Sequence, residues 1–319
     1  MTSQTGGFAE PDQPPATRAL PVLLGLGATW GASFLFIKVV VEDTGPMELV
    51  AGRMSFGMLA IWGIVLWQRR KVVVTPRLAL QVGALSFLTH IIPFMLISWG
   101  VERISSGSAS ILNATVPIFT AAFAAALLDD EYFTGGRAFG LLLAFAGVAV
   151  LAGEGVLDIT DSSVLGQLAC VAAAACYGVG AVLSRQMMRG QDATNLSLLQ
   201  LTLGTACAIP IMLAVTGGAP DFHWDPEAYA SIVVLGVAGT GIGYIAFLWL
   251  INTIGSVKAS LVTYLVPVIA VILGWAVLDE SIGVNTVAGG LLIVGGVASV
   301  MRDRGQPARH TDVPAAVGE

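Results

Sequence analysis

The stretch that decides the fold is WGASFLFIK, residues 30–38, together with its echo YGVGAVLSR, residues 177–185. Each belongs to an apolar segment that holds an aromatic–glycine pair and, further along, a cation. The matched positions lie 147 residues apart and are Trp30 and Tyr177, Gly31 and Gly178, and Lys38 and Arg185. A long hydrophobic chain built twice from one plan indicates a duplicated membrane protein.

The correspondence continues to the end of the chain with small changes of offset. Identical residues recur 150 or 149 positions later at Trp99, Ala109, Pro117, Glu131, Gly140 and Gly147. So many identities in register indicate duplication rather than chance composition.

The composition excludes an ordinary soluble domain. Hydrophobic residues make up 55% of the 319 residues and charged residues only 11%, with a mean hydropathy of +0.82. Soluble domains carry about 25% charged residues. The 38 glycines fit close helix packing in lipid, where small residues let backbones approach.

The hydropathy pattern predicts ten membrane-spanning helices, since a bilayer core requires about 20 apolar residues per helix. The predicted spans are 20–41, 46–67, 78–101, 107–127, 138–152, 164–184, 195–215, 228–250, 257–277 and 284–301. Pro76, Pro93 and Pro210 are expected to mark helix ends or kinks. Residues 1–19 are predicted to form a disordered cytoplasmic tail and residues 302–319 a second cytoplasmic tail.

The distribution of cations predicts the orientation. With the N-terminus in the cytoplasm, the inner loops hold nearly all Lys and Arg, and the outer loops hold only Arg103. Both termini are therefore predicted to be cytoplasmic, in a multi-pass protein of the cytoplasmic membrane. Five spans per repeat is an odd number, so the second copy must be upside down. The predicted fold is an all-α integral membrane protein with two inverted five-helix repeats, residues 20–152 and 164–301.

The ordered motifs resemble the EamA-type members of the drug/metabolite transporter superfamily, over about residues 20–301. The first copy carries WG-x-x-F-x-x-x-K, a proline-initiated second helix with Arg53, LDDE at 128–131 and a GLLLAFAGVAVL fifth helix. The second copy repeats this with YLVP at 264–267, LDE at 278–280 and GGLLIVGGV at 289–297. The resemblance implies export or exchange of small metabolites, often amino acids or related compounds, by two inverted five-helix domains.

Aromatic and cationic residues of the first span are candidates for a central cavity. Trp30, Phe34 and Lys38 are four residues apart, so they share one helical face. They could form an aromatic wall with a cation near the outer mouth, and Tyr177 and Arg185 occupy the matching places in the second copy. The alternative role for these residues is anchoring at the lipid headgroups. Anchoring suits Trp30 poorly because Trp30 lies at mid-span, whereas for Lys38 both roles remain open.

His90 lies near the middle of the third span, where an ionisable residue indicates function. It could bind substrate or a proton, or it could remain neutral and hydrogen-bond a neighbouring helix. Its repeat counterpart is Thr240, which cannot titrate. No Asp or Glu lies at mid-span, so the sequence predicts a facilitator, an exchanger or coupling through His90.

Further polar and aromatic positions complete the predicted cavity. The additional binding candidates are Phe94, Asn113, Tyr244 and Tyr264. Pro117 and Pro267 are candidate helix bends. The polar residues near them could face the cavity, or they could make hydrogen bonds that pack one helix against another. Arg53 is a charge or gating candidate that is expected to pair with Glu48 or backbone carbonyls. Glu131 and Glu280 are expected to support the N-terminus of the helix that follows each of them.

The predicted partners are a small-molecule substrate and the lipid bilayer, and a homodimer is left open. No motif indicates a nucleic-acid partner, a cofactor or a metal site. The catalytic motifs of a membrane-embedded lipid enzyme are not found, so the chain is predicted not to be an enzyme. A channel or facilitator for small solutes remains the main alternative to a secondary transporter, because inverted repeats permit both. The weakly polar, aromatic cavity favours neutral, zwitterionic or anionic solutes.

Overall fold

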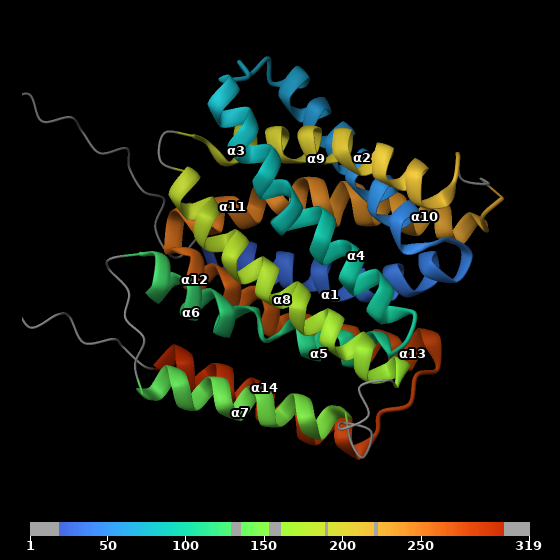
Figure 1. Cartoon of the computed structure of the whole chain (residues 1–319), viewed down its shortest axis with the longest axis vertical. Helices are drawn as coiled ribbons and strands as arrows, with labels where there is room; N and C mark the ends of the chain where they lie inside the picture. The colour runs from blue at the N-terminus through green and yellow to red at the C-terminus, as the bar shows by residue number, and fades with distance from the viewer. Residues whose placement is uncertain (1–18, 129–134, 153–160, 189–190, 220–222, 303–319) are drawn as a thin grey trace, which may run out of the picture.

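The computed structural model describes residues 19–128, 135–152, 161–188, 191–219 and 223–302, which form helices joined by short connections (Figure 1). No strand occurs within these ranges. The prediction of an all-α protein is therefore confirmed for the described part of the chain. Glu131, which was predicted to support the N-terminus of the helix that follows it, lies outside these residues.

Eight helical segments of the described residues are long and apolar enough to cross a membrane. Four are uninterrupted: α1 (Ala19–Asp43), α2 (Pro46–Trp67), α8 (Ser162–Met187) and α9 (Ala193–Thr216). Two segments of the first repeat are interrupted. One consists of α3 (Pro76–Ser86), η2 (Phe87–Ile91) and α4 (Ile92–Val101), and the other of α5 (Ser106–Asn113) and α6 (Val116–Leu127). Their counterparts comprise α10 (Pro226–Val234), η4 (Leu235–Ile242) and α11 (Gly243–Ile254), then α12 (Ser256–Ala259), η5 (Ser260–Tyr264) and α13 (Leu265–Leu278).

Two further helices, α7 (Gly135–Ala152) and α14 (Val284–Arg302), lie side by side along one edge of the molecule (Figure 1). Their apolar stretches are shorter than those of the other eight segments. A Cβ atom at Gly147 would lie 2.7 Å from the Gly289 carbonyl oxygen, and one at Gly296 would lie 2.5 Å from that of Gly140. Glycine at these positions lets the two backbones touch.

The interruptions fall at matching positions of the two repeats. The π-helical turns η2 and η4 are equivalent under the 150-residue offset, and π-turns often mark functional sites. In the first copy Pro93 favours the interruption, because it has no N–H to donate to the Thr89 carbonyl four residues earlier, whereas the second copy has Gly243 at the matching position. The break between α5 and α6 and the 3₁₀ turn η5 are likewise equivalent, and each precedes a predicted bend residue, Pro117 or Pro267.

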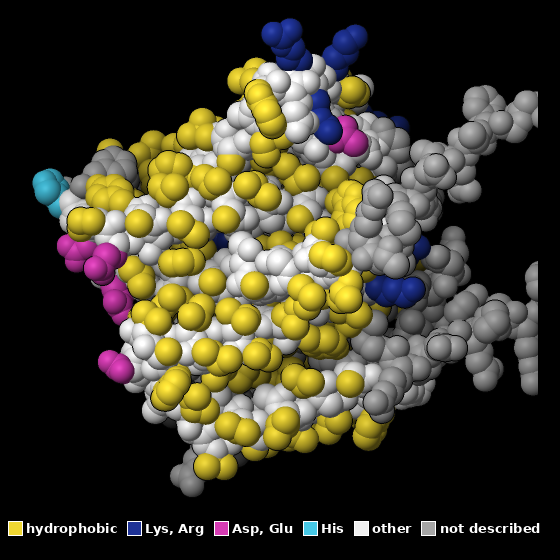
Figure 2. Space-filling view, turned by 180° about the vertical axis from the view of Figure 1, so that it is seen from behind, with side chains coloured by type: hydrophobic (Ala, Val, Ile, Leu, Met, Phe, Trp, Pro, Cys, Tyr) yellow, Lys and Arg dark blue, Asp and Glu magenta, His cyan; other side chains and the backbone are white. Residues whose placement is uncertain are grey.

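The surface is divided by residue type along one direction. Figure 2 shows hydrophobic side chains over most of one face, with most Lys and Arg at its upper and right edges and most Asp and Glu at its left edge. The exposed basic residues include Arg69, Arg70 and Lys71 in the loop between α2 and α3. Such an apolar belt between charged ends is what a membrane-spanning protein requires.

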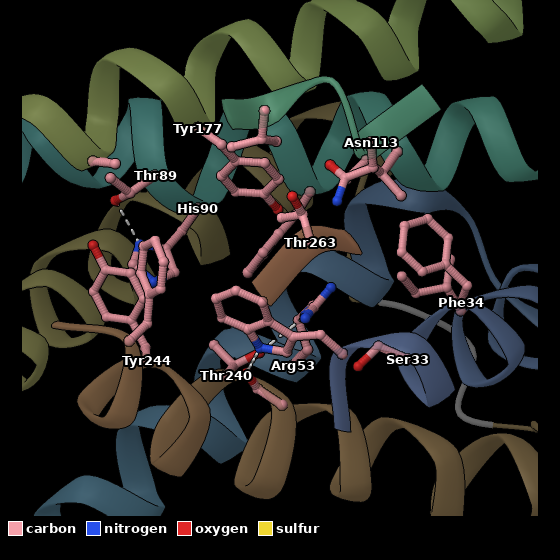
Figure 3. Close-up of a pocket in the computed structure, with 18 of the residues that line it drawn as sticks. Ser33, Phe34, Arg53, Thr89, His90, Asn113, Tyr177, Thr240, Tyr244 and Thr263 are labelled. Carbon is pink, nitrogen blue, oxygen red and sulfur yellow. Dashed lines mark hydrogen bonds between the residues drawn. The ribbon is translucent and has the colours of Figure 1, made fainter. Parts of the chain in front are cut away.

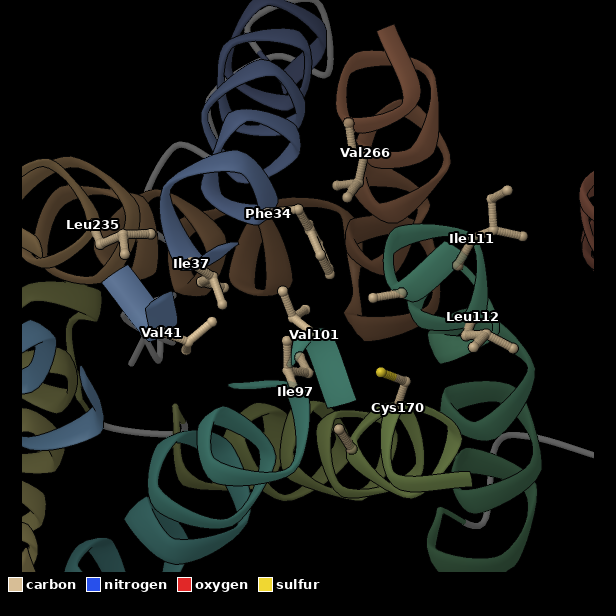
Figure 4. Packing of buried hydrophobic residues seen from close by; sticks show 14 of the residues in the cluster. Phe34, Ile37, Val41, Ile97, Val101, Ile111, Leu112, Cys170, Leu235 and Val266 are labelled. Atoms are coloured by element: carbon tan, nitrogen blue, oxygen red, sulfur yellow. The ribbon is translucent and has the colours of Figure 1, made fainter. Parts of the chain in front are cut away.

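The hydrophobic core joins the two repeats. Phe34 and Ile37 of α1 belong to one buried cluster with Ile97 of α4 and Leu235 and Val266 of the second repeat (Figure 4). Helix α1 therefore runs through the centre of the molecule, where its aromatic–glycine face meets the other half.

Glu280 stabilises a helix N-terminus, but not that of the following helix as expected. Its carboxylate accepts hydrogen bonds from the Ser106 amide (2.7 Å), the Ser106 hydroxyl (2.9 Å) and the Gly107 amide (3.3 Å). These groups form the first turn of α5, whose positive dipole end favours a negative charge. The prediction named the wrong helix because α5 belongs to the other repeat, which sequence proximity does not reveal.

Candidate functional site

A cavity lies between the two repeats, with an empty volume of about 810 Å³ that includes its open mouth (Figure 3). The space open to the centre of a water-sized molecule is about 90 Å³, several times what one water requires. Most of the described residues that line it fall into repeat-equivalent pairs, such as Trp30 with Tyr177, His90 with Thr240 and Phe94 with Tyr244. The cavity is thus built by the same positions of both copies.

Most of the predicted cavity residues line this space. The lining includes Trp30, Phe34, His90, Phe94, Asn113, Tyr177 and Tyr244, and also Arg53. The predicted residues that are not part of the lining are Tyr264, Lys38, Arg185, Pro117 and Pro267. Lys38 donates from Nζ to the Val101 carbonyl oxygen at the end of α4 (3.0 Å), where it satisfies a helix C-terminus.

Trp30 fixes one wall of the cavity. Its indole Nε1 donates to the Gly239 carbonyl oxygen in η4 (2.8 Å), and its ring lies 5.1 Å from that of Phe247. A half-buried indole with this partner joins α1 to the second repeat. The contact is with protein rather than with the lipid headgroups.

His90 belongs to a buried hydrogen-bond network at one end of the cavity (Figure 3). Its side chain is 1% exposed, and Nδ1 lies 2.8 Å from the Thr89 hydroxyl oxygen. Thr89 and Tyr244 hydroxyls each lie 2.8 Å from Oε1 of Gln200. The imidazole meets Tyr244 and Phe94 edge-on, at centroid distances of 4.4 and 5.4 Å. Two aromatic rings therefore contact the imidazole, which restricts its orientation.

Arg53 is buried (5% exposed) and faces the cavity from α2. Its Nε donates to the Thr240 hydroxyl oxygen (3.1 Å), and its guanidinium carbon lies 3.7 Å from the Phe94 ring centroid. The expected pairing with Glu48 is wrong, because the Glu48 carboxylate lies against Gly45 at the start of α2. The guanidinium instead crosses to the second repeat.

The two repeats each match a single known family: residues 17–153 and residues 164–302 match the EamA-like transporter family. The chain belongs to the EamA-like transporter family. It is accordingly a multi-pass membrane protein from a family of transporters, as its apolar helices require.

Relatives of this EamA-like transporter are named for transport. It is 26% identical to "Uncharacterized transporter YoaV" of Bacillus subtilis over 86% of this chain and 95% of that protein. It is also 26% identical to "Probable terminal-alkyne amino-acid exporter" of Streptantibioticus cattleyicolor, over 90% and 94% respectively. A solved structure described as "Crystal structure of protein" shares the fold, with a TM-score of 0.65 and 19% identity over 90% of this chain and 98% of that one.

Sequence reasoning missed several cavity residues of this EamA-like transporter. Thr89, Ser184 and Phe247 line the cavity, but such side chains are common in any apolar helix and give no signal alone. Gln200 is not part of the lining, but its Oε1 accepts hydrogen bonds from the Thr89 and Tyr244 hydroxyls, which are. The signal for it was its place as the repeat counterpart of Arg53, since an amide is unusual within an apolar span.

Proposed function

We propose that this EamA-like transporter works by alternating access and exports an amino acid or a related compound across the cytoplasmic membrane. The observation that carries the proposal is the cavity lined by equivalent positions of both repeats. A site built in this way can open to either side when the two halves exchange conformations.

Reciprocal contacts between the repeats support this symmetry. A Cβ at Gly31 would meet the Cβ of Ile269 at 2.5 Å, and one at Gly178 would meet that of Phe119 at 2.7 Å. Gly178 is the counterpart of Gly31, and Ile269 is the counterpart of Phe119. Equal contacts made in both directions support a pseudo-two-fold relation between two inverted halves.

The proposed topology has ten spans, with α7 and α14 as the fifth and the tenth. The basic end of the molecule faces the cytoplasm in this arrangement, by the positive-inside rule. The acidic end, with Glu42, Asp43 and Glu102, faces outward.

The lining supports an amino-acid-like substrate. Aromatic rings supply an apolar wall, and buried polar atoms such as Asn113 Oδ1 have no protein partner among the described residues. Ligand sites commonly combine an apolar lining with a few placed polar groups. The amino-acid exporter named above is similar along nearly its whole length.

The proposal is tested by counterflow in proteoliposomes loaded with a panel of amino acids. We expect saturable uptake of one chemical class by the wild-type protein. Trp30→Ala should reduce it by about 10-fold or more, because the substitution removes a wall of the cavity and its hydrogen bond to η4. Trp67→Ala is the matched control, since Trp67 is 84% exposed at the end of α2, and it should transport normally.

Two results would contradict the proposal. Uptake that never saturates, with ion or solute conductance in the same vesicles, would indicate a channel. Folded protein that takes up no member of the panel would contradict the amino-acid assignment. Export itself requires faster efflux of the identified compound from cells that express the chain than from cells that lack it.

A further inference from the structure

Arg53 is the only Lys, Arg, Asp or Glu among the described residues that line the cavity. In the part of the chain that the structure describes, no Asp or Glu forms an ion pair with it. Removing a cation from water without a counter-charge is costly, and such residues within membrane segments mark function. The stacking on Phe94 offsets only part of this cost.

Thr240 holds the guanidinium in place without occupying its binding edge. The Thr240 hydroxyl donates to the Leu235 carbonyl oxygen (2.9 Å), so its lone pairs are free to accept from Arg53 Nε. The two terminal nitrogens of Arg53 have no hydrogen-bond partner among the described residues. These two nitrogens are the ones that form paired hydrogen bonds with a carboxylate.

Asn113 offers a complementary group across the cavity. Its side chain is buried, and Oδ1 has no partner among the described residues. Figure 3 shows the Asn113 and Arg53 side chains reaching toward the middle of the cavity from different helices. In Figure 3 the amide nitrogen of Asn113 faces the middle of the cavity and Oδ1 is turned away from it. A half-turn of the amide group would bring the unpartnered Oδ1 to the cavity, where it suits an N–H donor such as an ammonium group.

We infer that Arg53 binds a carboxylate of the transported compound, and that Asn113, with its amide turned over, accepts a hydrogen bond from the amino group of that compound. This inference rests on the proposed function and specifies its substrate class as carboxylate-bearing. A substrate of this kind supplies the counter-charge that the protein lacks. Amides and esters of the same compound would leave Arg53 unpaired, and their ammonium group would add a second positive charge.

The test measures the affinity of the full-length protein in detergent for three probes: phenylacetate, L-phenylalanine and L-phenylalaninamide. All three carry the same ring, and only the first two carry a carboxylate. We expect both carboxylates to bind at least about 10-fold more tightly than the amide, as charge-assisted hydrogen bonds require. Arg53→Gln, which places the counterpart residue of the second repeat at this position, should abolish the preference. Arg53→Lys should keep part of it, because the charge remains without the planar fork.

Arg103→Gln is the matched control. Arg103 also stacks on an aromatic ring, with its guanidinium carbon 3.7 Å from the Trp99 centroid, but it lies outside the cavity lining and pairs with Glu102. This variant should keep the preference for carboxylates. Gel filtration and thermal unfolding verify that each variant is folded.

The outcomes separate the inference from the proposed function. Equal affinity for the amide and the carboxylates in the wild type, or a preference that survives in Arg53→Gln, would overturn the inference while amino-acid uptake could still stand. Binding of none of the three probes would overturn it as well. Arg53-dependent binding of phenylacetate, without uptake of any amino acid, would support the carboxylate site and contradict the proposed amino-acid substrate.

Discussion

Substrate on the receiving side of the membrane should accelerate efflux from proteoliposomes at least about 10-fold. The reason is that the empty transporter must close its cavity around Arg53 without a counter-charge. The penalty for a buried unpaired ion is several kcal/mol, and each 1.36 kcal/mol added to a barrier slows the step about 10-fold. The loaded transporter avoids this penalty because the substrate carboxylate neutralises the guanidinium.

The measurement compares efflux of one labelled carboxylate substrate with and without the same unlabelled compound outside. In Arg53→Gln, assayed at a substrate concentration that restores occupancy, the two rates should become nearly equal. The neutral glutamine side chain of this variant can be enclosed without a charge penalty, so the return of the empty transporter is no longer slow. Arg103→Gln should keep the wild-type ratio, because it changes a charge outside the cavity.

Equal rates for exchange and net efflux in the wild type would contradict this prediction. Such a result, obtained together with Arg53-dependent binding, would mean that water or another ion neutralises Arg53 in the empty state. The prediction therefore tests the charge balance of the cavity separately from its selectivity.

The helical architecture could be predicted from the sequence because both the hydropathy and the repeat are strong signals. Eight of the ten predicted spans lie inside the eight long apolar helical segments of the described residues. For example, the predicted span 107–127 lies within Ser106–Leu127. The π-turns and the α5–α6 break could not be placed, since they depend on where the backbone of one repeat meets the other. Pro93 and Pro117 indicated only that some interruption was near.

The cavity could be predicted in part, because some of its residues stand out in the sequence. His90, Asn113 and Trp30 are unusual in apolar spans, so they attract attention as single residues. The direction of a long side chain is not visible in the sequence. Local spacing favoured a contact between Arg53 and Glu48, whereas the structure joins Arg53 to Thr240, 187 residues away.

A single methyl group at Gly178 should destabilise the protein by about 1–3 kcal/mol, which is the usual cost of overpacking. A Cβ at this position of α8 would lie 2.7 Å from the Phe119 Cβ and 2.8 Å from the Thr120 backbone nitrogen. Backbone atoms cannot rotate away as a flexible side chain can. Relief would therefore require that α6 and α8 move apart.

Gly63→Ala is the matched control for Gly178→Ala. Gly63 is also helical, but nothing lies within 4 Å of a Cβ built there. Alanine in an open helical position should stabilise the chain by about 0.5–1 kcal/mol, because glycine loses more conformational entropy on folding. Thermal unfolding in detergent should give a lower midpoint for Gly178→Ala than for the wild type, and an equal or higher one for Gly63→Ala.

The repeat extends this prediction to Gly31→Ala, because Gly31 makes the equivalent contact with Ile269 and the Val266 carbonyl oxygen. If the two halves share one packing plan, the Gly31 and Gly178 substitutions should lower the midpoint by similar amounts. Their effects should be nearly additive in the double variant, since the two contacts share no residue. An unfolding midpoint for Gly178→Ala equal to that of Gly63→Ala would show that α6 and α8 do not touch at this point. The reciprocal contacts that support two inverted halves around the cavity would then be lost.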